Sequence, residues 1–95
     1  MSIGTGKVVL RLPGIKTLKD KRNLMRRISA FLKKNYELSL VEINTEDVAS
    51  ISVLELTRAA HSRMMAMSTL NKAIDAIEDN FDCLVVGREV KVLEV

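Results

Sequence analysis

The chain has few of the residues that catalysis, metal binding and disulfide bonding most often require. Its 95 residues include one cysteine, one histidine and no tryptophan. Cys83 cannot form a disulfide within the chain, and it lies far in sequence from His61, the only histidine. We therefore expect no metal-ligand cluster of known spacing and no cysteine nucleophile paired with a histidine base. The sequence predicts no enzymatic activity, no cofactor and no small-molecule substrate.

Long apolar runs are absent too. None approaches the roughly 20 residues that a membrane span requires, and the N-terminus lacks the layout of a secretory signal. A hydrophobic fraction of 47% with a charged fraction of 28% is typical of a globular chain rather than a disordered one. We predict a single domain over residues 1–95, located in the cytoplasm and without a membrane partner.

Acidic residues are nearly missing from the first third of the chain. Residues 1–36 hold ten lysines and arginines against Asp20 alone, which gives a net charge of +9. Residues 37–95 hold five lysines and arginines against eleven acidic residues, which gives a net charge of −6. The overall charge of +3 therefore hides a strong asymmetry. This asymmetry indicates an electrostatically attracted partner, or self-association of a dipolar domain.

The first third of the chain predicts a strand, a turn and a helix. Lys7–Leu12 is an apolar run that ends at a Pro-Gly pair, which is typical of a strand followed by a turn. Thr17, with Asp20 three residues later, matches the capping pattern of a helix start. Within residues 18–36 the apolar side chains recur on one side of a helix and most basic ones on the other.

The remainder predicts two strands, a second helix and a last strand. Glu37–Ile43 and Ile51–Leu56 are apolar runs around the polar connection NTEDVAS, which favours a hairpin. Over roughly His61–Asp79 the apolar residues recur with the period of a helix, which predicts the second helix. The segments CLVV and EVKVLEV indicate the last strand. The order β-α-β-β-α-β predicts an α+β, ferredoxin-like fold with a four-stranded antiparallel sheet and two helices on one face.

The predicted strands are apolar at both alternating positions. An antiparallel sheet with one solvated face should instead alternate between apolar and polar side chains. We infer that the second face is partly covered, most simply by another copy of the chain in a homodimer. The residues predicted for this dimer face are Val9, Val41, Ile43 and Leu54.

Three segments carry a likeness to a known family: LPGIKTLKDKR, VEI around Glu42, and LNKAIDAIED in the second predicted helix. In these segments the chain resembles the YlxP-like family of small bacterial proteins of unknown function. The chain departs from the family at Ala49-Ser50, where relatives tend to have Trp-Gln, and at Ala60-His61, where they tend to have Ser-Asn or Ser-Asp. The resemblance implies a ferredoxin-like fold and genes that often lie beside translation genes, with no assigned activity.

The basic side of the first predicted helix is the main candidate site. Its members would contact successive phosphates of ribosomal or other structured RNA, and they are Lys16, Lys19, Arg22, Arg26 and Lys33. The alternative is the solvated side of an ordinary helix, because lysine and arginine are good helix formers.

Lys21 falls on the apolar side of that helix instead. A buried ammonium without a partner is costly, so the side chain either extends to solvent or meets a carboxylate. Glu42 shares a strand face with two leucines and is the predicted partner in a Lys21–Glu42 ion pair that fixes the helix on the sheet.

Base stacking on the sheet is not predicted. This mode requires aromatic side chains in the strands, whereas Phe31, Tyr36 and Phe81 lie outside the predicted strands. We therefore predict a non-catalytic binding module that contacts RNA through its basic helix. The alternative is a homo-oligomeric assembly or protein-interaction protein whose basic helix meets an acidic protein surface.

Overall fold

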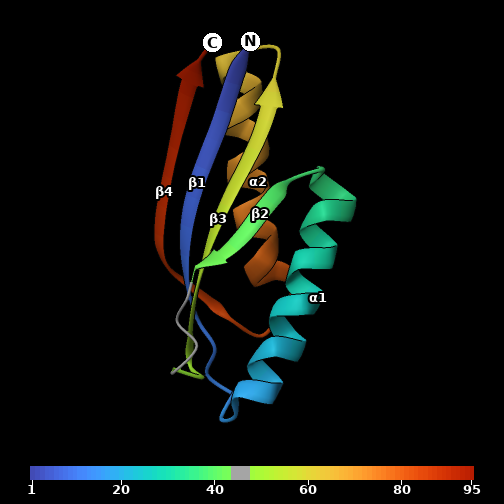
Figure 1. Cartoon of the computed structure of the whole chain (residues 1–95), viewed down its shortest axis with the longest axis vertical. Helices are drawn as coiled ribbons and strands as arrows, with labels where there is room; N and C mark the ends of the chain where they lie inside the picture. The colour runs from blue at the N-terminus through green and yellow to red at the C-terminus, as the bar shows by residue number, and fades with distance from the viewer. Residues whose placement is uncertain (44–47) are drawn as a thin grey trace.

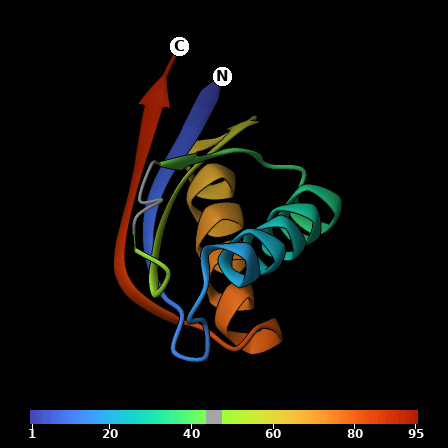
Figure 2. The same cartoon turned by 60° about the horizontal axis from the view of Figure 1, so that its bottom comes forward.

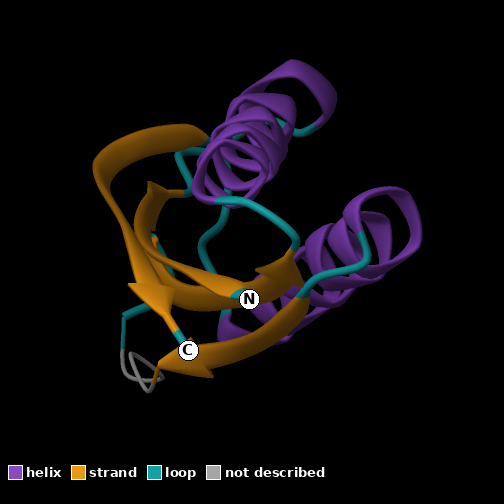
Figure 3. Cartoon of the chain, turned by 90° about the horizontal axis from the view of Figure 1, so that it is seen from above, coloured by secondary structure: helices purple, strands orange, loops and turns teal. Residues whose placement is uncertain are grey.

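Six elements follow the predicted order, and the computed structural model describes residues 1–43 and 48–95. The elements are β1 (Ser2–Arg11), α1 (Leu18–Tyr36), β2 (Ser39–Ile43), β3 (Ile51–Ala60), α2 (Arg63–Asn80) and β4 (Leu84–Glu94). All strand pairs are antiparallel, and the sheet order is β2-β3-β1-β4. Both helices lie on one side of the sheet (Figure 1, Figure 3). The predicted ferredoxin-like fold is confirmed.

β1 begins five residues before the predicted Lys7, because the sequence signal is weakened by two glycines. Gly4 and Gly6 are poor strand formers that offer no side chain to the hydrophobic pattern. Neither has a positive φ angle, so space rather than backbone conformation explains Gly4. A Cβ atom at Gly4 would lie 2.9 Å from Leu70 Cδ1 and 3.3 Å from the Ala66 carbonyl oxygen, so the glycine allows α2 to pack closely on β1.

α1 begins and ends at the predicted residues. Thr17 is its N-cap, and the Thr17 hydroxyl oxygen accepts a hydrogen bond from the Asp20 amide at 3.1 Å. At the other end Glu37 adopts the left-handed conformation with φ 53°, and its amide donates to the Lys33 carbonyl. These two caps satisfy backbone groups that have no partner within the helix.

The core fills the space between the sheet and the two helices. In β1 the even-numbered side chains are turned toward the helices, and in β3 the same holds for residues 52–58. The odd-numbered side chains of both strands lie on the other face, which we call the open face. Both helices lie on the opposite side of the sheet from this face (Figure 2). Residues without any exposed surface include Val8, Leu10, Leu12, Ile28, Leu32, Leu54, Leu70, Ile74 and Ile77.

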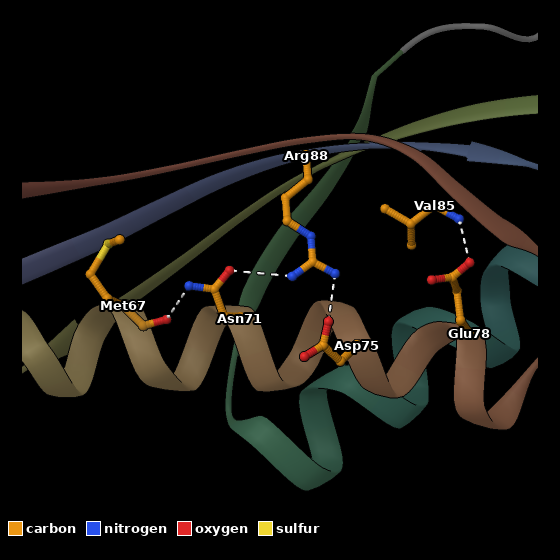
Figure 4. A network of polar contacts seen from close by, with 6 residues as sticks. All are labelled: Met67, Asn71, Asp75, Glu78, Val85 and Arg88. Atoms are coloured by element: carbon orange, nitrogen blue, oxygen red, sulfur yellow. Dashed lines mark hydrogen bonds and ion pairs between the residues drawn. The ribbon is translucent and has the colours of Figure 1, made fainter.

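β4 is one continuous edge strand, and polar contacts tie it to α2 (Figure 4). Its register with β1 shifts between Val9 and Leu10. Near this irregularity the Val85 amide donates to a Glu78 carboxylate oxygen at 3.1 Å. Asp75 lies about one turn before Glu78 in α2, and Arg88 pairs with it at 2.6 Å. The charge of Arg88 is therefore used within the fold.

Candidate functional site

The five cations predicted to contact phosphate are all exposed. Lys16 lies in the turn before α1, and the other four lie on α1: Lys19, Arg22, Arg26 and Lys33. We call these five residues the basic stripe. Because an α-helix rises about 1.5 Å per residue, the fourteen positions from Lys19 to Lys33 span about 21 Å.

The basic stripe lies on the side of α1 that is turned away from α2. On the α2 side, the Arg27 guanidinium lies 5.5 Å from the ring centroid of Phe81, and the Phe31 ring packs edge-on against Phe81 at 5.5 Å. At about 100° per residue, the stripe residues of α1 point to the opposite flank from Arg27 and Phe31. In Figure 1, α1 is the outermost element on the β2 side of the molecule.

No stripe residue takes part in the ion pairs found over residues 1–43 and 48–95. Those pairs join Arg63 with Glu94, Arg88 with Asp75, and Lys91 with Glu89. Each lies outside α1, although α1 carries seven of the fifteen lysines and arginines of the chain. The charge of the stripe is therefore not neutralised by carboxylates of the described residues.

Lys21 points into the protein, as its place on the apolar side of α1 predicts, and it is 3% exposed. Its ammonium donates a hydrogen bond to the Val48 carbonyl oxygen at 2.9 Å. A Glu42 carboxylate oxygen accepts instead from the Ser52 hydroxyl at 3.1 Å. Among the described ion pairs, the predicted one between Lys21 and Glu42 does not occur. The contact of Lys21 with Val48 nevertheless joins α1 to the residues just before β3.

The prediction that Leu54 belongs to the dimer face is wrong. Val9, Val41 and Ile43 lie on the open face as predicted, and Val41 is 62% exposed. Leu54 has no exposed surface and belongs to the core, because it pairs with Val8 across the sheet. Val53, the partner of Val9, takes its place on the open face. Both faces of this strand carry large apolar side chains between residues 51 and 56, so the sequence pattern alone does not distinguish them.

Cys83 and His61 are not arranged as a catalytic pair. His61 is exposed in the turn before α2. Cys83 is 5% exposed, and burial, with the nearby carboxylates of Glu78 and Asp82, raises the pKa of its thiol. The thiol is therefore protonated at neutral pH, which disfavours a nucleophilic role. Over the described ranges, no three side chains of His, Cys, Asp or Glu gather as metal ligands would.

A cavity of about 440 Å³ lies between the turn before α1 and the C-terminal end of α2. Its lining includes the carboxylates of Asp20 and Asp82 and the guanidinium of Arg27. Two carboxylates oppose the binding of an anion there, so the basic stripe on the outer side of α1 remains the better candidate for phosphate contact.

Neither helix described by the structure is long and apolar enough to span a membrane.

The fold is shared with proteins of very different sequence. The de novo designed protein Foldit4 is 8% identical, with a TM-score of 0.54 and coverage of 100% of this chain and 99% of that one. The designed ferredoxin-fold protein LFR1 1 is 13% identical, with a TM-score of 0.50 and coverage of 100% and 88%. SnoaB, a cofactor-independent oxygenase from Streptomyces nogalater, is 10% identical, with a TM-score of 0.50 and coverage of 98% and 92%. At these identities the likeness concerns the fold alone.

No curated protein matches the chain in sequence. Residues 3–90 match the model of a family described as "Protein of unknown function (DUF503)", and the chain therefore belongs to this family.

Proposed function

We propose that the chain is a non-catalytic binding module that contacts structured RNA, such as ribosomal RNA, through the basic stripe. The observation that carries the proposal is the row of five exposed cations, none of which is paired with a described carboxylate. An unneutralised row of this kind attracts a polyanion and releases its counterions on binding. A length of about 21 Å along α1 allows contact with several phosphates of one strand.

The contact would read the shape and phosphates of RNA rather than its bases. Double-stranded RNA is recognised mainly through its backbone and 2′-hydroxyl groups, because its major groove is too narrow for side chains. All three aromatic residues lie away from the open face: Phe31 contacts both Tyr36 and Phe81 on the helix side. The base-stacking mode of sheet-based RNA recognition therefore lacks its platform in this chain.

The resemblance of LPGIKTLKDKR to the YlxP-like family supports the same proposal. We assign the chain to the YlxP-like branch, whose genes often lie beside translation genes. The carriers of the resemblance include Lys16, Lys19 and Arg22, so the resembling stretch and the basic stripe overlap. A ribosomal partner in the cytoplasm fits both the family resemblance and the charge of the basic stripe.

A salt titration of RNA binding tests the proposal. With a folded ribosomal RNA fragment, five phosphate contacts predict that log K falls against log salt with a slope of about −3.5 to −4.5. Fluorescence anisotropy with labelled RNA between 50 and 300 mM salt would measure about this slope. Absence of binding at the lowest salt would contradict the proposal and leave an acidic protein as the partner of the stripe.

A further inference from the structure

The open face is ordered in rows that cross the sheet. The pairing registers of β1 with β3 and β4, and of β3 with β2, place side chains of neighbouring strands side by side. The first row is Ala59, Ile3 and Leu93, and the second is Ser39, Thr57, Thr5 and Lys91. The third row is Val41, Glu55, Lys7 and Glu89, and the fourth is Ile43, Val53, Val9 and Gly87.

These rows are apolar at both ends of the sheet and polar in the middle. The first and fourth rows contain only apolar side chains and one glycine, and Leu93 in the first row is 55% exposed. Beyond the fourth row the exposed apolar residues Ile51 and Leu84 flank Arg11. So much exposed apolar surface on one face indicates that the face is covered.

The two middle rows carry four charges that sum to zero. They line a hollow of about 410 Å³ whose walls include Lys7, Glu55, Glu89 and Lys91. Lys7 lies between Glu55 and Glu89 in its row, and the Lys91 ammonium pairs with Glu89 at 2.8 Å. A face with equal numbers of lysine and glutamate suits a partner of the same composition, and does not favour a polyanion.

We propose that the open face binds a second copy of the chain, with the two-fold axis running along the strands between β1 and β3. This axis places β1 of one protomer over β3 of its partner, and β4 over β2, so that each row meets the same row. Lys7 then faces the glutamate at position 55 of the other copy, twice per dimer. Likewise Val9 faces the valine at position 53, and Thr5 the threonine at position 57.

The other simple two-fold axis in the plane of the interface, perpendicular to the strands, does not bring these opposite charges together. It places β1 over β1 and β3 over β3, so Lys7 cannot face the glutamate at position 55 of the other copy. If this axis passes midway between the second and third rows, Lys7 meets Thr5 and Glu55 meets Thr57, so neither charge meets an opposite one. If it passes through the third row, Lys7 meets a second Lys7, and the polar second row meets the apolar fourth row. Like charges facing each other are destabilising, and polar groups buried against valine side chains lose their hydrogen bonds to water. The opposite charges of Lys7 and Glu55 therefore select the axis along the strands.

The size of the open face also suits a dimer. The four strands contain 36 residues, and at about 3.3 Å per residue and about 4.8 Å between strands they give a footprint of roughly 570 Å². This is close to the 800 Å² or so that each partner contributes to a standard interface. The dimer would use the face opposite to the helices, so it does not rest on RNA binding by the basic stripe.

Neutral substitutions at Lys7 and Glu55 test the proposed register without placing like charges together. Analytical ultracentrifugation should find the wild-type chain at twice its mass of 10.6 kDa. We expect Lys7→Gln and Glu55→Gln each to raise the dimer dissociation constant about 10-fold, because each leaves a charge of the partner unpaired. The double variant Lys7→Gln with Glu55→Gln should have a dissociation constant close to that of either single variant, since both substitutions remove the same contact.

Lys7→Glu alone and Glu55→Lys alone should each abolish the dimer. The two substitutions together exchange the charges and should restore it. Circular dichroism shows which of these variants are folded. Lys72→Glu on the outer side of α2 is the matched control, and it should leave the dimer unchanged. A wild-type chain that stays at 10.6 kDa at high concentration would overturn the dimer. A Lys7→Gln chain that dimerises more tightly would overturn the axis, because that result requires Lys7 to face its own copy.

Discussion

Replacing Arg22 and Arg26 together by glutamate should weaken RNA binding about 100-fold at low salt and reduce the salt slope by about two. Both side chains are exposed in the middle of the basic stripe. The substitution removes two phosphate contacts and places two negative charges beside the RNA backbone. The helix itself should tolerate the change, because the two positions are four residues apart and already carry like charges.

The matched control reverses two cations on the other helix. Arg63→Glu with Lys72→Glu changes the net charge by the same amount, but both positions lie on α2 outside the basic stripe. Anisotropy titrations of both double variants at one salt concentration separate contact from overall charge. Equal loss of affinity in the two variants would mean that RNA responds to net charge and not to the stripe.

Gly4→Val should destabilise the fold by about 2–3 kcal/mol, because the core has no room for the added carbons. The first added atom would already lie 2.9 Å from Leu70 Cδ1 and 3.2 Å from Ala66 Cβ. The Leu70 side chain can turn aside, but the Ala66 carbonyl belongs to the backbone of α2, so the helix itself must move away from β1. In a thermal melt followed by circular dichroism, Tm should fall by about 10 °C or more.

Gly14→Ala is the control for this substitution. The nearest atom to a Cβ at Gly14 is a carboxylate oxygen of Asp82 at 3.9 Å, which is ordinary contact. Its φ angle is not positive, so alanine causes no backbone strain. The Gly14→Ala chain should melt within a few degrees of the wild type. A Gly4→Val chain as stable as this control would show that α2 does not pack on β1 as described.

The order of elements could be predicted from sequence because each has a strong local signal. Thr17 and Asp20 start α1 in both sequence and structure, and its apolar period fixes the side that packs on the sheet. The start of β1 could not be predicted, since Gly4 is explained only by its contact with Leu70 of a distant helix.

The exposure of the basic stripe could be predicted, because the helical period of the apolar residues in the sequence shows which side of the helix faces solvent. The two faces of β3 do not follow from the sequence in this way, because both carry large apolar side chains. The sequence therefore predicts Leu54 on the open face, whereas it lies in the core. The row that contains Glu55, Lys7 and Glu89 depends on the register between β3, β1 and β4, which no local pattern specifies. Similarly, the Lys21 contact with Val48 joins residues 27 positions apart in sequence, and no local pattern specifies it.

Mapping the RNA contact residue by residue tests the central proposal most directly. In an NMR titration of the ¹⁵N-labelled chain with a folded ribosomal RNA fragment at low salt, amide signals of residues 16–34 should shift. Signals of the open face, including those of Thr5, Lys7 and Glu55, should remain in place. Shifts that gather on the open face, or spectra that do not change with RNA, would contradict the assignment of the basic stripe as the RNA-binding surface.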